Sequence, residues 1–151
     1  MRSRPTILFH SPDARPVPAV LRRWAEVRGF PVLEFRRGAE LESIVLRGAS
    51  CLIFLDGDET GADGLAMVRR LKADAFTAIV PAVVLSGTHA PERVGEWFAA
   101  GADEVITGFF APAEQRARLD AMLVRTERDV SVHPSTRLPG TTEIERAIRV
   151  Q

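Results

Sequence analysis

Carboxylates follow directly after an apolar run in the stretch "CLIFLDGDETGADG", residues 51–64. Asp56 ends the run, and Asp58 and Glu59 lie in the loop behind it. A carboxylate at the end of a buried strand can serve as a nucleophile, and carboxylates grouped in a loop can bind a hard cation such as Mg²⁺. The alternative is a solvated acidic turn, which needs no chemistry. Both interpretations of Asp56 require knowing which elements position it.

Five short apolar runs alternate with stretches of helical spacing along the chain. The expected strands are residues 6–9, 31–35, 51–55, 80–85 and 104–106, and the expected helices are residues 17–28, 39–47, 64–73, 91–100 and 112–127. Gly29, Gly48 and Gly101 follow three of these helices, where a left-handed cap is needed. This alternation predicts a parallel sheet with helices on both faces. Because ligands bind at the carboxyl ends of such strands, Asp56 and Ser86 are expected to meet there.

The composition is that of one globular domain. The formal net charge of zero gives no global attraction to nucleic acid or to an anionic membrane, so neither is an expected partner. Cys51 is the single cysteine, which excludes an internal disulfide and a zinc site built from several cysteines. The N-terminal apolar stretch is too short for a signal peptide or a membrane span, so the expected location is cytoplasmic.

Three stretches, in matching order and spacing, resemble the receiver domains of response regulators, which have the CheY-like fold. They are "CLIFLDGDETGADGLAMVRRLKAD", "PAVVLSGTHAPERV" and "AAGADEVITGFFAPAEQRARLDAML". The resemblance covers roughly residues 5–126. It implies an α/β fold of the doubly wound (βα)5 flavodoxin-like type, a three-layer sandwich with parallel strand order 2-1-3-4-5. It also implies that Asp56 lies at the phosphoacceptor position and Ser86 at the position of the switch hydroxyl.

The acidic pair that helps receivers to hold Mg²⁺ is absent from "ILFHSPDAR". Aligning the strand puts His10 and Ser11 at its positions, whereas aligning "SPDAR" on the common "EPDIR" pattern puts Phe9 and His10 there, and neither alignment supplies an acid. Asp13 is the nearest carboxylate. Losing even about 1.4 kcal/mol of attraction weakens binding tenfold. The expected cofactor is therefore none, or Mg²⁺ held weakly by Asp13, Asp56 and Asp58.

A second departure from the receiver pattern lies in "DEVITGFFAP". Gly108 and Phe109 occupy the positions where receivers usually carry a lysine and a proline, and Val105 replaces the usual switch aromatic. The lysine contacts the phosphoryl oxygens in active receivers, so its absence removes a cation from the developing negative charge. The resemblance therefore predicts that Asp56 accepts a phosphoryl group poorly.

His10 and Ser86 each have a second interpretation. A histidine at a strand end can act as a metal ligand or general base, but a lone histidine favours a hydrogen-bonded structural role. Ser86 acts either as the switch hydroxyl or as a partner for local backbone at the strand end.

The fourth helix, fifth strand and fifth helix form the expected interaction face, since receivers often use it. Gln115 and Arg116 replace the usual leucine pair there, which predicts a more polar contact. Val94 and Phe98 share one helix face, so Phe98 is expected in the core and Trp97 turned partly away, available to a partner or to a neighbouring loop. Trp97 is also the expected apolar anchor for a partner.

The composition changes near the end of the chain, which divides it into a receiver-like domain, residues 1–128, and a linker with a first helix, residues 129–151. The segment "HPSTRLPGTTEIERAI" resembles the start of diguanylate cyclase domains of the GGDEF type. The alternative is a generic tail in which Thr141 or Thr142 caps a short helix.

Three functions compete at this stage. The leading one is a degenerate receiver, which is not an enzyme and works as a regulatory module for protein binding or homodimerisation in two-component or cyclic-di-GMP signalling. The second is a phosphorylatable receiver that uses Asp56 to control a downstream diguanylate cyclase. The third is an α/β binding protein or enzyme unrelated in use, because fold alone does not fix function.

Overall fold

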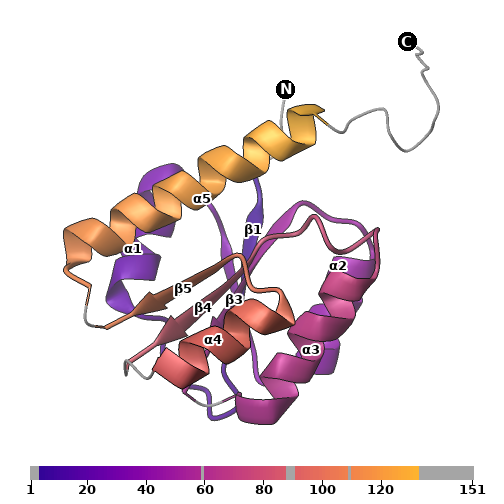
Figure 1. Cartoon of the computed structure of the whole chain (residues 1–151). Helices are drawn as coiled ribbons and strands as arrows, with labels where there is room; N and C mark the ends of the chain where they lie inside the picture. Colours follow the sequence, from indigo (N-terminus) through magenta and orange to yellow (C-terminus); the bar gives the residue numbers. More distant parts are fainter. Residues whose placement is uncertain (1–3, 59, 88–90, 109, 133–151) are drawn as a thin grey trace. The chain divides into compact units, whose positions relative to one another are not determined.

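Five parallel strands form a single sheet in the order β2-β1-β3-β4-β5, which confirms the predicted order (Figure 1). The structure is a computed structural model that describes residues 4–58, 60–87, 91–108 and 110–132. The strands are β1 (Thr6–His10), β2 (Val32–Phe35), β3 (Cys51–Asp56), β4 (Ala82–Ser86) and β5 (Glu104–Thr107). The helices are α1 (Ala19–Arg28), α2 (Gly38–Leu46), α3 (Gly61–Ala73), α4 (Pro91–Ala100) and α5 (Pro112–Val132).

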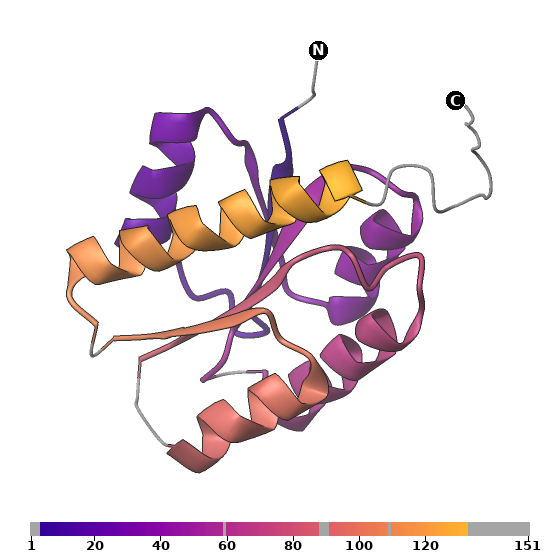
Figure 2. The same cartoon turned by 45° about the horizontal axis from the view of Figure 1, so that its top comes forward.

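Helices cover both faces of the sheet, as its apolar strands predict (Figure 2). Helices α2, α3 and α4 pack on one face around a cluster that includes Leu8, Ile53 and Val84. On the other face, Trp24 of α1 lies 6.5 Å from Phe54 of β3, measured between ring centroids. The central strand β3 is therefore buried along its whole length.

The chain forms two compact units, residues 1–120 and residues 121–151. Helix α5 crosses their boundary and continues past Arg128, where the sequence predicts that a linker begins. Of the predicted linker and first helix, residues 129–151, the part from residue 133 onward lies outside the described residues. This part holds the cyclase-like segment with Thr141 and Thr142. Within the described part of the chain, no helix combines the length and apolar character needed to span a bilayer.

Four strands extend one residue beyond their expected apolar ends, to His10, Asp56, Ser86 and Thr107. The parallel ladder continues through these polar residues, since Asp56 is paired with Leu85 and Ser86 with Thr107. The polar side chains are thereby fixed at the carboxyl edge of the sheet by regular backbone pairing. At the opposite end of the helices, Gly29, Gly48 and Gly101 have φ values of 73°, 82° and 113°, so the expected left-handed conformations are confirmed.

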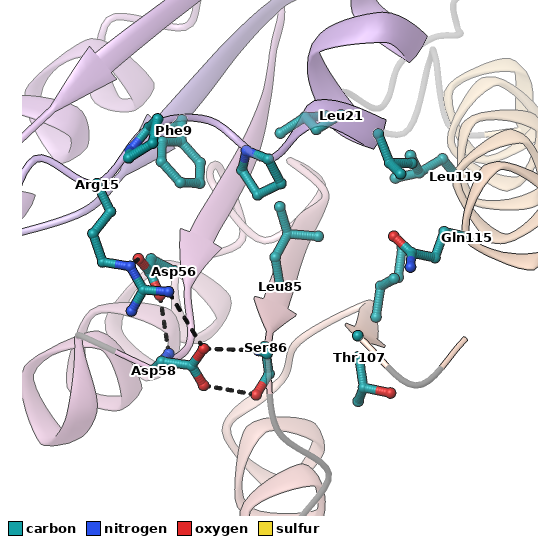
Figure 3. A pocket seen from close by; sticks show the side chains of 16 residues that line it. Phe9, Arg15, Leu21, Asp56, Asp58, Leu85, Ser86, Thr107, Gln115 and Leu119 are labelled. Carbon is teal, nitrogen blue, oxygen red and sulfur yellow. Dashed lines mark hydrogen bonds and ion pairs between the residues drawn. The ribbon is translucent and has the colours of Figure 1, made fainter. Parts of the chain in front are cut away.

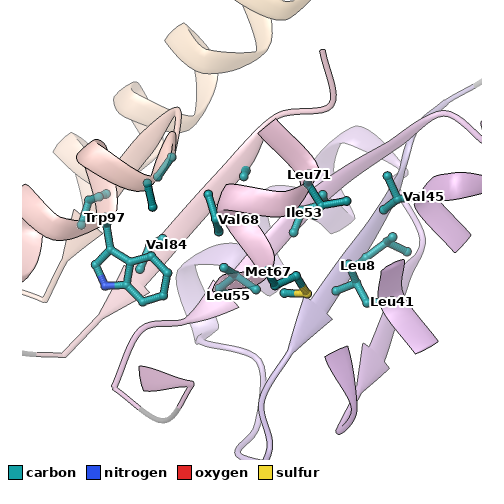
Figure 4. Packing of buried hydrophobic residues seen from close by; sticks show 14 of the residues in the cluster. Leu8, Leu41, Val45, Ile53, Leu55, Met67, Val68, Leu71, Val84 and Trp97 are labelled. Atoms are coloured by element: carbon teal, nitrogen blue, oxygen red, sulfur yellow. The ribbon is translucent and has the colours of Figure 1, made fainter. Parts of the chain in front are cut away.

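The expected orientation of α4 is wrong. Trp97 is 2% exposed and belongs to the apolar cluster, whereas Phe98 is 46% exposed (Figure 4). Gly64, outside α4, leaves room for the indole, because a Cβ placed on it would lie 2.9 Å from the ring. Since neighbouring helical side chains point in different directions, burying Trp97 turns Phe98 outward.

Replacing these two neighbours tests the corrected orientation. Trp97→Ala should lower the free energy of unfolding by about 3–5 kcal/mol, because it leaves a large cavity. Phe98→Ala, the matched control, should lower it by about 1 kcal/mol or less, since half of that ring already meets water. Urea unfolding followed by far-UV circular dichroism measures both. Equal losses, or a larger loss for Phe98→Ala, would contradict the packing of α4.

Candidate functional site

Polar side chains from three loops converge at the carboxyl edge of the sheet, beside the end of β3 (Figure 3). The predicted pair, Asp56 and Ser86, does meet there, with Asp58 between them. Figure 3 also shows Arg15, from the loop after β1, reaching Asp56 and Asp58. Convergence was predictable from parallel strands, but the contribution of Arg15 was not anticipated.

Asp56 is buried and both of its carboxylate oxygens already have partners. Its Oδ2 accepts a hydrogen bond from the Ser11 hydroxyl at 3.2 Å and lies 3.4 Å from Nε of Arg15. Its Oδ1 accepts the backbone N–H of Asp58 at 3.1 Å. With only 6% of the residue exposed, these donors replace most of the water that a free carboxylate would bind.

Asp58 joins the loops that follow β3 and β4. Its Oδ1 accepts the Ser86 hydroxyl at 2.9 Å, and its Oδ2 accepts the backbone N–H of Gly87 at 2.7 Å. The same Oδ2 lies 3.8 Å from the Arg15 guanidinium. Ser86 thus contacts a side chain at the site, that of Asp58.

The loop after β1 brings Arg15 back to the sheet edge. Ala14 has a φ of 56°, and its backbone N–H donates to the Ser11 carbonyl at 3.0 Å. The next N–H, that of Arg15, donates to the Ser11 hydroxyl at 3.2 Å. Ser11 therefore orients the loop and Asp56 together. The available sequence signal was an arginine four residues beyond Ser11, in a loop at the same sheet edge.

His10 has the structural role that its isolation favoured. The residue is 5% exposed, and its Nε2 lies 3.1 Å from the Arg36 carbonyl oxygen, while its Nδ1 is buried without a hydrogen-bond partner. Burial lowers the pKa of His10 below its ordinary value, although the Arg36 carbonyl and the charge of Asp56 act in the opposite direction. A neutral imidazole is therefore favoured in the folded protein.

Gly108 lies close to the loop after β4. Its N–H donates to the Ser86 carbonyl at 2.8 Å, and a Cβ placed on it would lie 3.3 Å from the Gly87 carbonyl oxygen. A side chain at position 108 therefore needs this backbone to move slightly. Val105 is buried in the apolar cluster, and Phe109 lies outside the described residues.

A pocket of about 200 Å³ lies next to the polar side chains of the site. Figure 3 shows Arg15, Asp56 and Asp58 on one side of it and Leu21 and Leu119 on the other. Most of its remaining wall is apolar. The site thus combines a charged edge with an apolar recess.

The described residues do not fit a magnesium ion as they stand. Asp13 is exposed, and no group of three or more His, Cys, Asp or Glu side chains in the described ranges is arranged to hold a metal. The oxygens of Asp56 and Asp58 instead face N–H and O–H donors. The expected weak site at Asp13, Asp56 and Asp58 is therefore absent from this arrangement.

The residues expected at the interaction face separate in the structure. Trp97 is buried, so it cannot be the apolar anchor. Gln115 is half-buried, and its side-chain nitrogen donates to the Phe110 carbonyl at 2.7 Å, which fixes the loop before α5. Arg116 is exposed, as a contact residue must be.

The lowered pKa of His10 predicts a pH-dependent stability. The unfolded chain takes up the proton near pH 6.5, whereas the folded protein does so only at lower pH. Stability should therefore fall as the pH drops from above 6.5 towards the lowered pKa. His10→Gln should lose this part of the pH dependence, while the other two histidines remain in both proteins. Urea midpoints at about pH 7.5 and 5.5 test it, and equal losses in both proteins would contradict the assignment to His10.

The comparisons with known proteins point to one kind of domain, although no family model matches the chain. The chain is 31% identical over 114 residues to the phosphate regulon transcriptional regulatory protein PhoB of Pseudomonas aeruginosa, covering 76% of this chain and 50% of that protein. It is 30% identical over 118 residues to PhoB of Rhizobium meliloti, covering 78% of this chain and 52% of that protein. The chain thus spans about half the length of these curated relatives.

Solved structures agree on the fold. A CheY-like receiver domain protein from Methanospirillum hungatei gives a TM-score of 0.65 at 18% identity, covering 84% of this chain and 99% of that chain. A response regulator from Thermotoga maritima gives 0.66 at 20% identity, covering 81% and 99%. Sequence identities this low show that the fold is shared and nothing more. The two PhoB proteins, at 30% identity or above, indicate which kind of protein this chain is. Since both comparisons agree, this chain belongs to the response-regulator receiver domains.

Proposed function

We propose that this receiver domain is degenerate: it relays a signal by binding protein, either a partner or a second copy of itself, and Asp56 is not an efficient phosphoacceptor. The observation that carries the proposal is the set of groups around Asp56. Ser11 and His10 occupy the positions of the acidic pair, and Gly108 occupies that of the lysine. Ser11 hydrogen-bonds Asp56 directly, and His10 is turned to the Arg36 carbonyl.

The chemistry of phosphoryl transfer explains why these replacements matter. A carboxylate that attacks a phosphoryl group meets like charge, and the transferred group spreads further charge over its oxygens. Oxygen-ligated Mg²⁺ and a nearby cation normally neutralise both. Here Asp56 would also have to release the hydrogen bonds that now hold both of its oxygens. The attack by Asp56 is therefore disfavoured, and the phosphorylated product would lack the usual Mg²⁺ and lysine.

The alternative is a phosphorylatable receiver. It is favoured by Asp56 itself, which remains at the end of β3, and by Ser86, which lies in the same hydrogen-bonded cluster through Asp58. Arg15 also supplies one cation near Asp56. Phosphorylation of Asp56 would then need a phosphoryl donor that reacts without the usual magnesium ligands.

The output of the whole protein is a separate part of the proposal. The segment at residues 133–148 resembles the start of a diguanylate cyclase domain, which favours a role in cyclic-di-GMP signalling. The relatives, in contrast, are named as transcriptional regulators. Cyclic-di-GMP synthesis by the full natural gene product, measured with GTP and Mg²⁺, would support the cyclase output; specific DNA binding without synthesis would oppose it.

Phosphorylation distinguishes the two functions. With acetyl phosphate and millimolar Mg²⁺, the wild-type chain should show no alkali-labile acyl-phosphate adduct by intact mass, just like its control Asp56→Asn. Beryllofluoride with Mg²⁺ should likewise leave the amide NMR shifts near Asp56 unchanged. A saturable response in the wild type that disappears in Asp56→Asn would overturn the degenerate reading and support the phosphorylatable one.

Binding through the face of α4, β5 and α5 should depend on its exposed residues. Phe98→Ala and Arg116→Glu should each weaken self-association, or binding of an identified partner, by about tenfold or more if they contribute hot-spot contacts. Light scattering over a concentration series measures the self-association. Val27→Ala is the control, because Val27 is an exposed apolar residue on α1. Equal behaviour of all three variants would exclude this face.

A further inference from the structure

We infer that Arg15 is a built-in counter-ion: its guanidinium takes the place of a metal cation between Asp56 and Asp58 and keeps divalent ions out of the site. The inference rests on the proposed degenerate function and adds a reason for it within the molecule. Its basis is that the carboxylates of Asp56 and Asp58 face N–H and O–H donors, whereas a magnesium site needs oxygen ligands.

The position of the guanidinium is the first observation. Its Nε lies 3.4 Å from Asp56 Oδ2, and one of its terminal nitrogens lies 3.8 Å from Asp58 Oδ2. One cation thus approaches both carboxylates, as a bound metal would. Guanidinium is always charged, and its planar N–H groups suit carboxylate oxygens.

The local backbone holds Arg15 in this position. The left-handed turn at Ala14 and the hydrogen bond from the Arg15 N–H to the Ser11 hydroxyl fix the base of the side chain. Ser11 also donates its own proton to Asp56. The counter-ion and the carboxylate are therefore fixed by the same serine, which occupies a position where a metal-binding receiver carries an acid.

Charge counting gives the second argument. Asp56, Asp58 and Arg15 together carry a net charge of about −1, whereas the two carboxylates alone carry −2. A divalent ion needs anionic oxygen ligands, and here it would also meet repulsion from the guanidinium. Removing the positive charge of Arg15 should end this repulsion and return the net charge of the site to that of the two carboxylates.

Arg15→Gln is the decisive variant, because it removes the charge and keeps a polar side chain. Its matched control is Arg36→Gln, which removes the same charge from an exposed arginine in the loop after β2. Titration with Mn²⁺, followed by paramagnetic broadening of amide NMR signals near Asp56, measures binding without any phosphorylation. Mg²⁺ competition then tests whether the same site is used.

We expect Arg15→Gln to bind Mn²⁺ at least about tenfold more tightly than the wild type and Arg36→Gln, which should match each other. The gain should disappear in the double variant Arg15→Gln/Asp56→Asn. If Arg15→Gln does not fold by circular dichroism, Arg15→Met, which keeps the aliphatic length, gives the same comparison.

The outcomes separate the two proposals. If the folded Arg15 variant binds Mn²⁺ no more tightly than Arg36→Gln, the counter-ion role is wrong. That outcome leaves the proposed degenerate function unaffected. If the wild type itself binds Mg²⁺ at millimolar concentration and accepts a phosphoryl group at Asp56, the degenerate function is wrong.

Discussion

Two carboxylates at the end of a buried strand need compensation, and this need organises the whole carboxyl edge of the sheet. Strand β3 is buried throughout, so Asp56 emerges where water is scarce. An uncompensated buried carboxylate would be strongly unfavourable. The donors come from three loops: Ser11 and Arg15 after β1, the backbone of Asp58 after β3, and Ser86 with Gly87 after β4, the last two through Asp58. The contacts that compensate the charges of Asp56 and Asp58 are therefore the same contacts that fix these loops.

An arginine and a metal ion neutralise carboxylates with different consequences. A metal ion binds from solution, so its site responds to concentration and leaves room for further oxygen ligands. Arg15 is covalently attached, and its effective concentration does not change. If Arg15 is the counter-ion that we propose, both carboxylates keep one arrangement whatever ions are present. A receiver neutralised in this way suits a constant binding surface better than a chemical switch, which agrees with the proposed role as a protein-binding module.

Much of the fold could be predicted from the sequence, because apolar runs of strand length alternate with helical spacing and the glycines mark helix ends. The meeting of Asp56 and Ser86 followed from the same pattern, since parallel strands end at one edge. Arg15 could not be placed this way, because its approach depends on the left-handed turn at Ala14, a residue whose type does not favour that conformation. The orientation of Trp97 was missed for a related reason: space for its ring is made by Gly64, a glycine outside α4.

The packing of Trp97 bears on how such a site could transmit a change. Trp97, Val105, Asp58 and Ser86 line one pocket on the α4 side of the sheet. Val105 is small where receivers usually carry a movable aromatic, while the large ring is supplied by α4 and enclosed in the core with Gly57 beside it. Although Trp97 borders this pocket, it is 2% exposed, so a shift of its ring disturbs the close-packed neighbours on its other sides. Trp97 therefore helps to hold α4 in place against the loop after β3, and in the proposed role as a binding module this packing would preserve the shape of the exposed face of that helix.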